Sequence, residues 1–474
     1  MREAEMVDVD RREFLRKTLA AGVLIVPVSG MVAGCATAGG GDQEQAKGDV
    51  SAKNPLGVDP EASLEVITFA GGLKTTFPEV QAAYKSLHKG AKVDVKGMVN
   101  INSLQPRFAG GNPPDLVDDS GAQKIPLGAL VGGKQLADLG PLLDAPAAGG
   151  DGKKVRETLV DGTVDVGSYN GTFHAMNYVL FVYGLWYSQP LFDKRGWEMP
   201  TQWPDFVTLC GEMKAAGIAP LGFGGQNATQ YITTTMLTMA AKAGGPDVLV
   251  KIDNLEPGAW EQAAVGDAAT AIEELAGKKY FLPGAAALTH TQAQTEWVKG
   301  EVGCYPNASW IENEMKSATP KGFEMVMAPT PSLTANDAMP AETLYSSPGE
   351  SFVVPRKASN ARGGMEFLRH MLSKDNAMAY TDETGSLTVV QAANDAVQPK
   401  TSGLRSTQEA VRAAGENTVT YIHNLWYGDL HKACTQAMAD LLAGRKNAEQ
   451  YVKACQAAAD KTAGDDKIEK YTRK

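Results

Sequence analysis

The sequence ASLEVITF at residues 62–69 alternates apolar and polar side chains, which predicts a β-strand at the start of the folded region. A helix pattern at residues 78–87 and a second strand pattern at 91–95 follow it. Another helix pattern near residues 104–109 leads into GGNPPDLVDD at 110–119, where Gly and Pro mark a turn. Strands and helices that alternate in this way indicate an α/β fold.

The later chain repeats this alternation. A helix pattern at residues 203–215 ends before Gly217, and a short strand pattern at 219–223 follows. Residues 426–459 predict two helices, broken at 444–447. The length of 474 residues favours two domains or lobes, although no internal repeat proves two of them.

The N-terminus has the pattern of an export signal. RREFLRK at residues 11–17 is a twin-arginine pattern, and the apolar run that follows it is too short to span a bilayer comfortably. The run ends at VAGC, residues 32–35, which resembles the lipobox of bacterial lipoproteins. An ordinary cleaved signal with a chance cysteine is the alternative. We therefore predict a twin-arginine lipoprotein signal peptide at residues 1–34 and lipidation of Cys35.

Residues 35–61 show no helix or strand period and are rich in small and polar side chains, which predicts a flexible tether. The expected location is the cell membrane, with the protein lipid-anchored on the extracytoplasmic face.

Composition excludes several classes of function. The formal net charge of −10 argues against nonspecific nucleic-acid binding, and five cysteines are too few for a disulfide-stapled mini-fold. The six histidines lack metal-ligand spacing, and the chain contains no Gly-x-Ser-x-Gly elbow, zinc helix or Walker A loop. We expect no metal, no cofactor and no enzyme activity.

Five stretches carry a resemblance to a known family: YNGTFHA at 169–175, GLWYSQPLF at 184–192, PTQWPDF at 200–206, VGCYPNASW at 302–310 and NLWY at 424–427. In this order and spacing they resemble the extracellular solute-binding proteins that include the maltose-binding protein. The third stretch departs from the family pattern by the insertion of Gln202. The resemblance spans residues 62–460.

This resemblance implies a periplasmic-binding-protein-like type II fold, with two α/β lobes, a ligand cleft and hinge crossings near 175–180, 322–328 and 378–386. The implied N-terminal lobe comprises residues 62–175 and 326–378. The implied C-terminal lobe comprises residues 179–322 and 385–474.

A narrower resemblance rests on PPDLVDDSGA at 113–122, WIENEMK at 310–316, PGESFVVP at 348–355 and TGSLTVV at 384–390. These stretches are similar to an actinobacterial subgroup that binds N-acetylglucosamine and diacetylchitobiose. The likeness implies the monomeric sugar-binding lipoprotein of an ABC importer, whose permease and ATPase are separate chains. Another oligosaccharide such as cellobiose or maltose, an exported glycosidase that uses Asp119 and Glu350, and an adhesion module are the alternatives.

Sugar rings need aromatic platforms for their C–H faces and fixed polar groups for their hydroxyls. Trp310 and Trp426, the latter with Tyr427, match positions of sugar-stacking tryptophans in the maltose-binding relatives, with core packing as the alternative. Asp118 and Asp119 are expected sugar ligands or helix caps. Glu350 is an expected ligand or a surface ion-pair member. The further expected polar and aromatic contacts are Asn177, Tyr178, Gln226, Asn227, Tyr231 and Ser386.

Two cysteine pairs are candidates for disulfides. Cys434 and Cys455 lie nearly symmetrically about the turn at Gly444–Arg445, so antiparallel helices would bring them face to face. Export to an oxidising exterior permits this bond, and buried free thiols are the alternative. Pairing of Cys210 with Cys304 stays open.

Overall fold

The computed structural model describes residues 47–121, 123–150 and 152–473. The expected signal peptide, Cys35 and the first part of the expected tether lie outside these residues. No helix in the described part of the chain is long and apolar enough to cross a membrane.

Nine strands of the described residues form one sheet, in the order β2-β1-β3-β10-β6-β8-β7, with β9 paired to β6 and β11 paired to β10. The strands are β1 (Leu64–Phe69), β2 (Val93–Met98), β3 (Leu116–Asp118), β6 (Ala175–Ser188), β7 (Ala219–Leu221), β8 (Val302–Ala308), β9 (Met325–Ala328), β10 (Leu344–Val353) and β11 (Thr418–Val419). A separate hairpin joins β4 (Ser168–Tyr169) and β5 (Thr172–Phe173).

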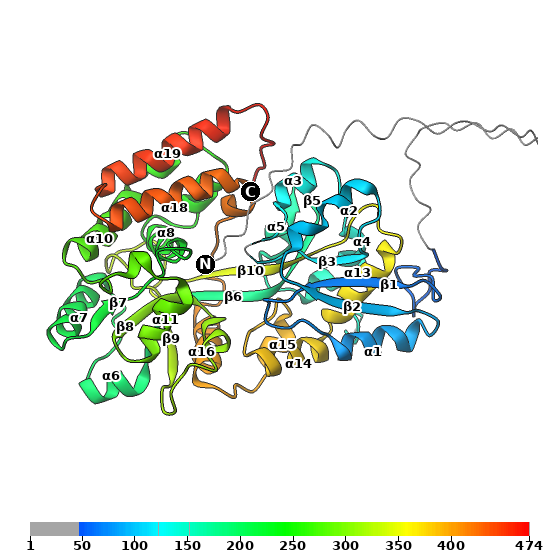
Figure 1. Ribbon diagram of the computed structural model, residues 1–474, viewed down its shortest axis with the longest axis horizontal. Coiled ribbons are helices and arrows are strands. Elements are labelled where there is room, and N and C mark those ends of the chain that lie inside the picture. Colours follow the sequence, from blue (N-terminus) through cyan, green and yellow to red (C-terminus); the bar gives the residue numbers. More distant parts are fainter. Residues whose placement is uncertain (1–46, 122, 151, 474) are drawn as a thin grey trace, which may run out of the picture. The chain divides into compact units, whose positions relative to one another are not determined.

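Helices divide into two groups toward the opposite ends of the long strands β6 and β10 (Figure 1). The N-terminal lobe contains α1 (Pro78–Leu87), α2 (Gln105–Gly110), α3 (Leu127–Gly132), α4 (Gly140–Asp144), α5 (Thr163–Val166), α13 (Ala361–Met371), α14 (Lys374–Thr384) and α15 (Gln391–Ala396). The C-terminal lobe contains α6 (Gln189–Arg195), α7 (Trp203–Ala215), α8 (Gln230–Gly244), α9 (Asp247–Asp253), α10 (Ala263–Gly277), α11 (His290–Val298), α12 (Ile311–Glu314), α16 (Ser402–Ala414), α17 (His423–Trp426), α18 (Gly428–Leu442) and α19 (Ala448–Gly464).

Strands β6 and β10 are the crossings between the lobes (Figure 1). They run antiparallel from the pair Tyr345–Tyr183 to the pair Val353–Ala175, and the far end of β6 pairs with β8 and β9. A crossing was expected near 322–328, but that segment leads into β9, which stays at the C-terminal end of β6. Sequence patterning predicts a strand only at residues 352–354, at the end of β10, because the centre of β10, SSPGES, interrupts the apolar alternation of a strand.

The core of the N-terminal lobe forms around Phe77, just before α1. Its ring stacks at 6.2 Å on Tyr380 of α14 and meets Phe352 and Phe367 edge-on. Val389 and Val390 pack in the same cluster, whereas Leu387 packs with the C-terminal lobe. The chain therefore returns to the N-terminal core beyond residue 385, where the C-terminal lobe was expected to begin.

The described residues 47–61 are packed against α13 and do not behave as the expected tether. The Asn54 side chain accepts a hydrogen bond from Val58 N at 2.8 Å, and Arg362 of α13 donates to the Leu56 carbonyl at 3.0 Å. Leu56 and Val58 are buried in the N-terminal core. Two well-placed apolar side chains are enough to order a segment whose average composition is polar.

The four described cysteines are buried free thiols, so the structure contains neither the expected Cys434–Cys455 disulfide nor the Cys210–Cys304 bond that the sequence left open. Cys434 on α18 and Cys455 on α19 nevertheless lie within hydrogen-bonding distance, and this contact, with burial, raises the pKa of Cys434. The antiparallel helices thus bring these two side chains together, and the bond itself stays a prediction.

Candidate functional site

A cavity of about 690 Å³ lies where the crossing strands meet the two lobes. Phe69 and Asp119, at the ends of β1 and β3, line it from the N-terminal lobe. Tyr231 of α8, His290 of α11 and Glu314 of α12 line it from the C-terminal lobe. A volume of this size with walls from two lobes is typical of a small-molecule site.

The crossing strands present one shared face to this cavity. Asn177 of β6 lies opposite Ser351 of β10, and Phe181 lies opposite Ser347 in the same register. All four line the cavity, because alternate residues of a strand face the same side. Tyr178 faces the core instead, where its hydroxyl donates to a backbone carbonyl of α13.

Aromatic rings form one wall of the cavity around Trp310, which follows β8. The centroid of its ring lies 4.8 Å from that of Phe181, 5.4 Å from Tyr183 and 5.8 Å from Tyr231. These neighbours hold the half-buried indole in place while part of it faces the cavity. Such a wall suits the apolar C–H face of a sugar ring.

The two neighbouring aspartates differ in their surroundings. Asp118 points inward, where it accepts hydrogen bonds from Phe69 N and the Ser120 hydroxyl, and it is not part of the cavity wall. Asp119 lines the cavity, and its Oδ1 accepts a hydrogen bond from Ile125 N at 2.8 Å. Its Oδ2 is buried with no hydrogen-bond partner among the described residues. Burial raises the pKa of Asp119 to about 7.

Glu350 reaches the cavity from a strained backbone position in β10. Its φ of 52° lies in the left-handed region that non-glycine residues rarely adopt. Its carboxyl accepts hydrogen bonds from Leu73 N and from the Tyr380 hydroxyl, both at 3.1 Å. Burial and the nearby Asp118 raise the pKa of Glu350. Glu350 is therefore a polar group in a fixed position at the hinge.

Three polar side chains of the C-terminal lobe are linked by hydrogen bonds at the wall of the cavity. His290 Nε2 lies 2.9 Å from Glu314 Oε1, and the Asn227 amide nitrogen lies 2.8 Å from His290 Nδ1. The hydrogen bond to Glu314 raises the pKa of His290. Asn227 thus supports His290 from behind the wall, and Gln226 bonds the Ala287 carbonyl instead of facing the cavity.

Three more expected contacts, besides Asp118, Tyr178, Gln226 and Asn227, lie away from the cavity. The ring of Trp426 packs 5.6 Å from Tyr471, and the Tyr427 hydroxyl accepts a hydrogen bond from Tyr471 N at 2.9 Å. Both residues are buried in the core, because the C-terminal segment covers the face that was expected to meet sugar. Ser386 is also fully buried and does not line the cavity.

Sequence reasoning missed His290, Glu314, Phe181 and Tyr183. A signal existed for Glu314, since it lies four residues after Trp310 and one helical turn brings such positions to the same side. Phe181 and Tyr183 read as ordinary buried strand residues, because periodicity does not tell which face of a strand meets a cavity.

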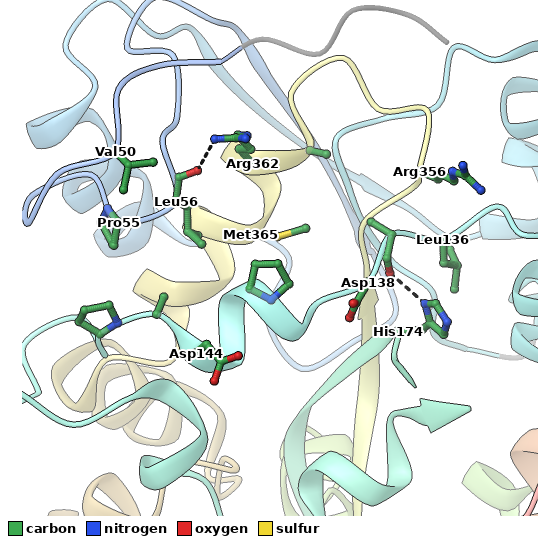
Figure 2. A pocket seen from close by; sticks show the side chains of 15 residues that line it. Val50, Pro55, Leu56, Leu136, Asp138, Asp144, His174, Arg356, Arg362 and Met365 are labelled. Carbon is green, nitrogen blue, oxygen red and sulfur yellow. Dashed lines mark hydrogen bonds between the residues drawn. The ribbon is translucent and has the colours of Figure 1, made fainter. Parts of the chain in front are cut away.

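A second cavity, of about 800 Å³, lies on the N-terminal lobe between residues 50–56, α4 and α13 (Figure 2). Its described lining contains no Trp, Tyr or Phe ring, and its polar groups include the charged side chains of Asp138, Asp144 and Arg362. Arg362 is already bonded to the Leu56 carbonyl there. Without an aromatic platform, this cavity is less suited to a sugar than the one between the lobes.

No group of three or more His, Cys, Asp or Glu side chains within residues 47–473, as far as described, could hold a metal ion. The lining of the inter-lobe cavity includes aromatic rings, carboxyls and amides, together with His290, His431 and Lys124.

The sequence pattern of bacterial extracellular solute-binding proteins matches residues 70–378, more than half of the chain. The chain belongs to this family. The proteins of this family are extracellular, which indicates a location outside the cytoplasm. The family and the fold expected from the quoted motifs are confirmed.

One curated relative extends over almost the whole chain. The diacetylchitobiose-binding protein NgcE of Streptomyces coelicolor is 35% identical over 468 residues, which cover 98% of each chain. This likeness supports the subgroup expected from the narrower motifs.

Solved structures of solute-binding proteins show the same fold. RafE of Streptococcus pneumoniae, in its apo form, superposes with a TM-score of 0.66 at 17% identity, covering 85% of this chain and 98% of its own. A chitin oligosaccharide-binding protein superposes with a TM-score of 0.63 at 17% identity, covering 81% of this chain and 93% of its own.

Proposed function

We propose that this solute-binding protein captures N-acetylglucosamine or diacetylchitobiose and delivers the sugar to the permease of an ABC importer. The observation that carries the proposal is the 35% identity to a diacetylchitobiose-binding protein across 98% of both chains. The inter-lobe cavity supports it, because Trp310 offers an aromatic face while Asp119, Asn177 and Glu350 offer polar groups.

Capture works by closure of the two lobes around the sugar. The sugar touches Trp310 and Tyr231 from the C-terminal lobe and Asp119 from the N-terminal lobe, so only a closed arrangement makes all contacts at once. A ligand shifts the equilibrium toward the form that it binds better. Strands β6 and β10 carry the motion, since both run between the lobes.

The closed form then docks on the permease, which is a separate chain that works with its own ATPase. In this proposal the protein is a monomer, anchored through lipid on Cys35, and it releases its sugar unchanged. A glycosidase would cleave chitin oligomers, so incubation with them followed by product analysis should return only intact sugar.

Titration calorimetry with N-acetylglucosamine, diacetylchitobiose, cellobiose and maltose tests the proposal. We expect the two acetamido sugars to bind at least about fivefold more tightly than the other two, because a buried polar group left without its partner costs about 1–3 kcal/mol. Tight binding of cellobiose or maltose, with no heat from the acetamido sugars, would contradict the substrate.

A further inference from the structure

The lining of the inter-lobe cavity contains one hydrogen-bond acceptor and one hydrogen-bond donor that have no partner among the described residues. Asp119 Oδ2 and Asn177 Nδ2 are both buried, and neither has a hydrogen-bond partner among the described residues. Both side chains line the cavity, although they are only 2% and 1% exposed. Buried polar atoms without partners are rare in folded proteins, so this pair points to a ligand that supplies both partners.

Ser351 of β10 holds the pair in place. Its carbonyl accepts a hydrogen bond from Asp119 N at 2.8 Å. Its hydroxyl donates to Asn177 Oδ1 at 2.6 Å, which leaves the NH2 group of Asn177 free to face the cavity. The donor and the acceptor are thus oriented before any ligand arrives.

We infer that Asn177 and Asp119 together bind a single acetamido group of the sugar. The Asn177 Nδ2 donates to the acetamido carbonyl, and Asp119 Oδ2 accepts the acetamido N–H. The inference rests on the proposed function and adds to it the two residues that select N-acetylated sugars.

The two side chains lie in one row across the sheet. Asp119 follows β3 and Asn177 lies on β6, and β10 lies between these strands. Asp119 N donates to the Ser351 carbonyl, and Ser351 lies opposite Asn177, so the backbones of Asp119 and Asn177 are about two strand spacings apart. An acetamido group carries an acceptor and a donor at opposite ends of a planar amide, whereas a hydroxyl offers both at one oxygen atom.

Other sugars leave one of the two atoms without a partner. The C2 hydroxyl of glucose in cellobiose can donate to Asp119 but offers no carbonyl to Asn177. The ammonium group of glucosamine can donate to the carboxyl of Asp119 but has no acceptor for Asn177. A buried group left unpaired costs about 1–3 kcal/mol, which corresponds to about a fivefold to 150-fold loss of affinity.

The test compares affinity for diacetylchitobiose with affinity for cellobiose in the full protein and its variants. Asn177→Asp removes the donor, and Asp119→Asn replaces the acceptor by an amide of the same shape. Each should lower the ratio of the diacetylchitobiose affinity to the cellobiose affinity by about tenfold. Ser351→Ala, which frees the Asn177 side chain without removing it, should lower the preference less.

Asn307→Asp is the matched control. Asn307 is a buried asparagine of β8 whose Nδ2 also has no partner among the described residues, but it does not line the cavity. This variant should keep the wild-type preference. Melting curves and retained cellobiose binding show that each variant is folded.

Two failures are distinguishable. A wild-type protein that does not prefer diacetylchitobiose contradicts the proposed function and this inference with it. If the wild-type protein prefers diacetylchitobiose and the folded Asn177 and Asp119 variants keep that preference, the result contradicts the inference alone.

Discussion

Trp310 and Trp426 were both expected to stack on the sugar, but in the structure only Trp310 lines the cavity. Trp310 lies in the aromatic wall of the cavity, 4.8 Å from Phe181. Trp426 lies in the core, 5.6 Å from Tyr471 and outside the cavity wall. Replacing each by alanine should therefore change different properties.

Trp310→Ala removes the stacking surface for the sugar. Truncation of an aromatic anchor in a binding site costs about 2 kcal/mol or more, which weakens the affinity for diacetylchitobiose at least about 25-fold. Trp426→Ala instead opens a void in the core, and truncation of a buried tryptophan lowers the free energy of unfolding by about 3–5 kcal/mol. Sugar affinity of the folded fraction should stay close to wild type.

Titration calorimetry gives the affinities, and denaturant unfolding gives the stabilities of the same preparations. The reasoning is refuted if Trp426→Ala loses sugar affinity at wild-type stability. Wild-type affinity in Trp310→Ala would refute it equally, because the aromatic wall would then be a packing feature.

Three further predictions follow from single groups. The free energy of unfolding of the sugar-free protein should fall as pH rises from about 4 to about 7, because burial raises the pKa of Asp119 to about 7 and the folded state holds that proton more tightly. The variant Asp119→Asn should flatten this dependence on pH in denaturant titrations, and an unchanged dependence would assign it to other groups. The four described cysteines are free thiols in the structure, and thiol counting on the denatured, unreduced mature protein tests the Cys434–Cys455 bond that export to an oxidising exterior would allow: the bond predicts protection of these two thiols, and four reactive thiols besides Cys35 would exclude every disulfide. Cys35→Ala should leave the protein soluble or as an unprocessed precursor, and labelled palmitate in that variant would disprove lipidation at Cys35.

Local patterns predicted the regular elements well. The helices Pro78–Leu87 and Trp203–Ala215 lie where the sequence predicts them, since proline at the start and polar or glycine residues at the end mark their limits. Only the end of strand β10 was predicted, because Pro348 and Gly349 interrupt the pattern, yet the pairing with β6 holds the whole segment as a strand. Tertiary pairing overrode local preference there.

The site was predictable only in part. Asp119, Asn177, Tyr231, Trp310 and Glu350 line the cavity, and each was proposed from a motif or from a chemistry suited to sugar. The position of Trp426 was not predictable, since the covering Tyr471 lies 45 residues further along the chain and local patterns do not show such contacts.

The crystal structure of the complex with diacetylchitobiose tests the central claim most directly. The account predicts the sugar in the inter-lobe cavity, with one ring against Trp310 and an acetamido group between Asp119 Oδ2 and Asn177 Nδ2. Sugar bound in the cavity between α4 and α13, or an acetamido group that touches neither residue, would contradict it.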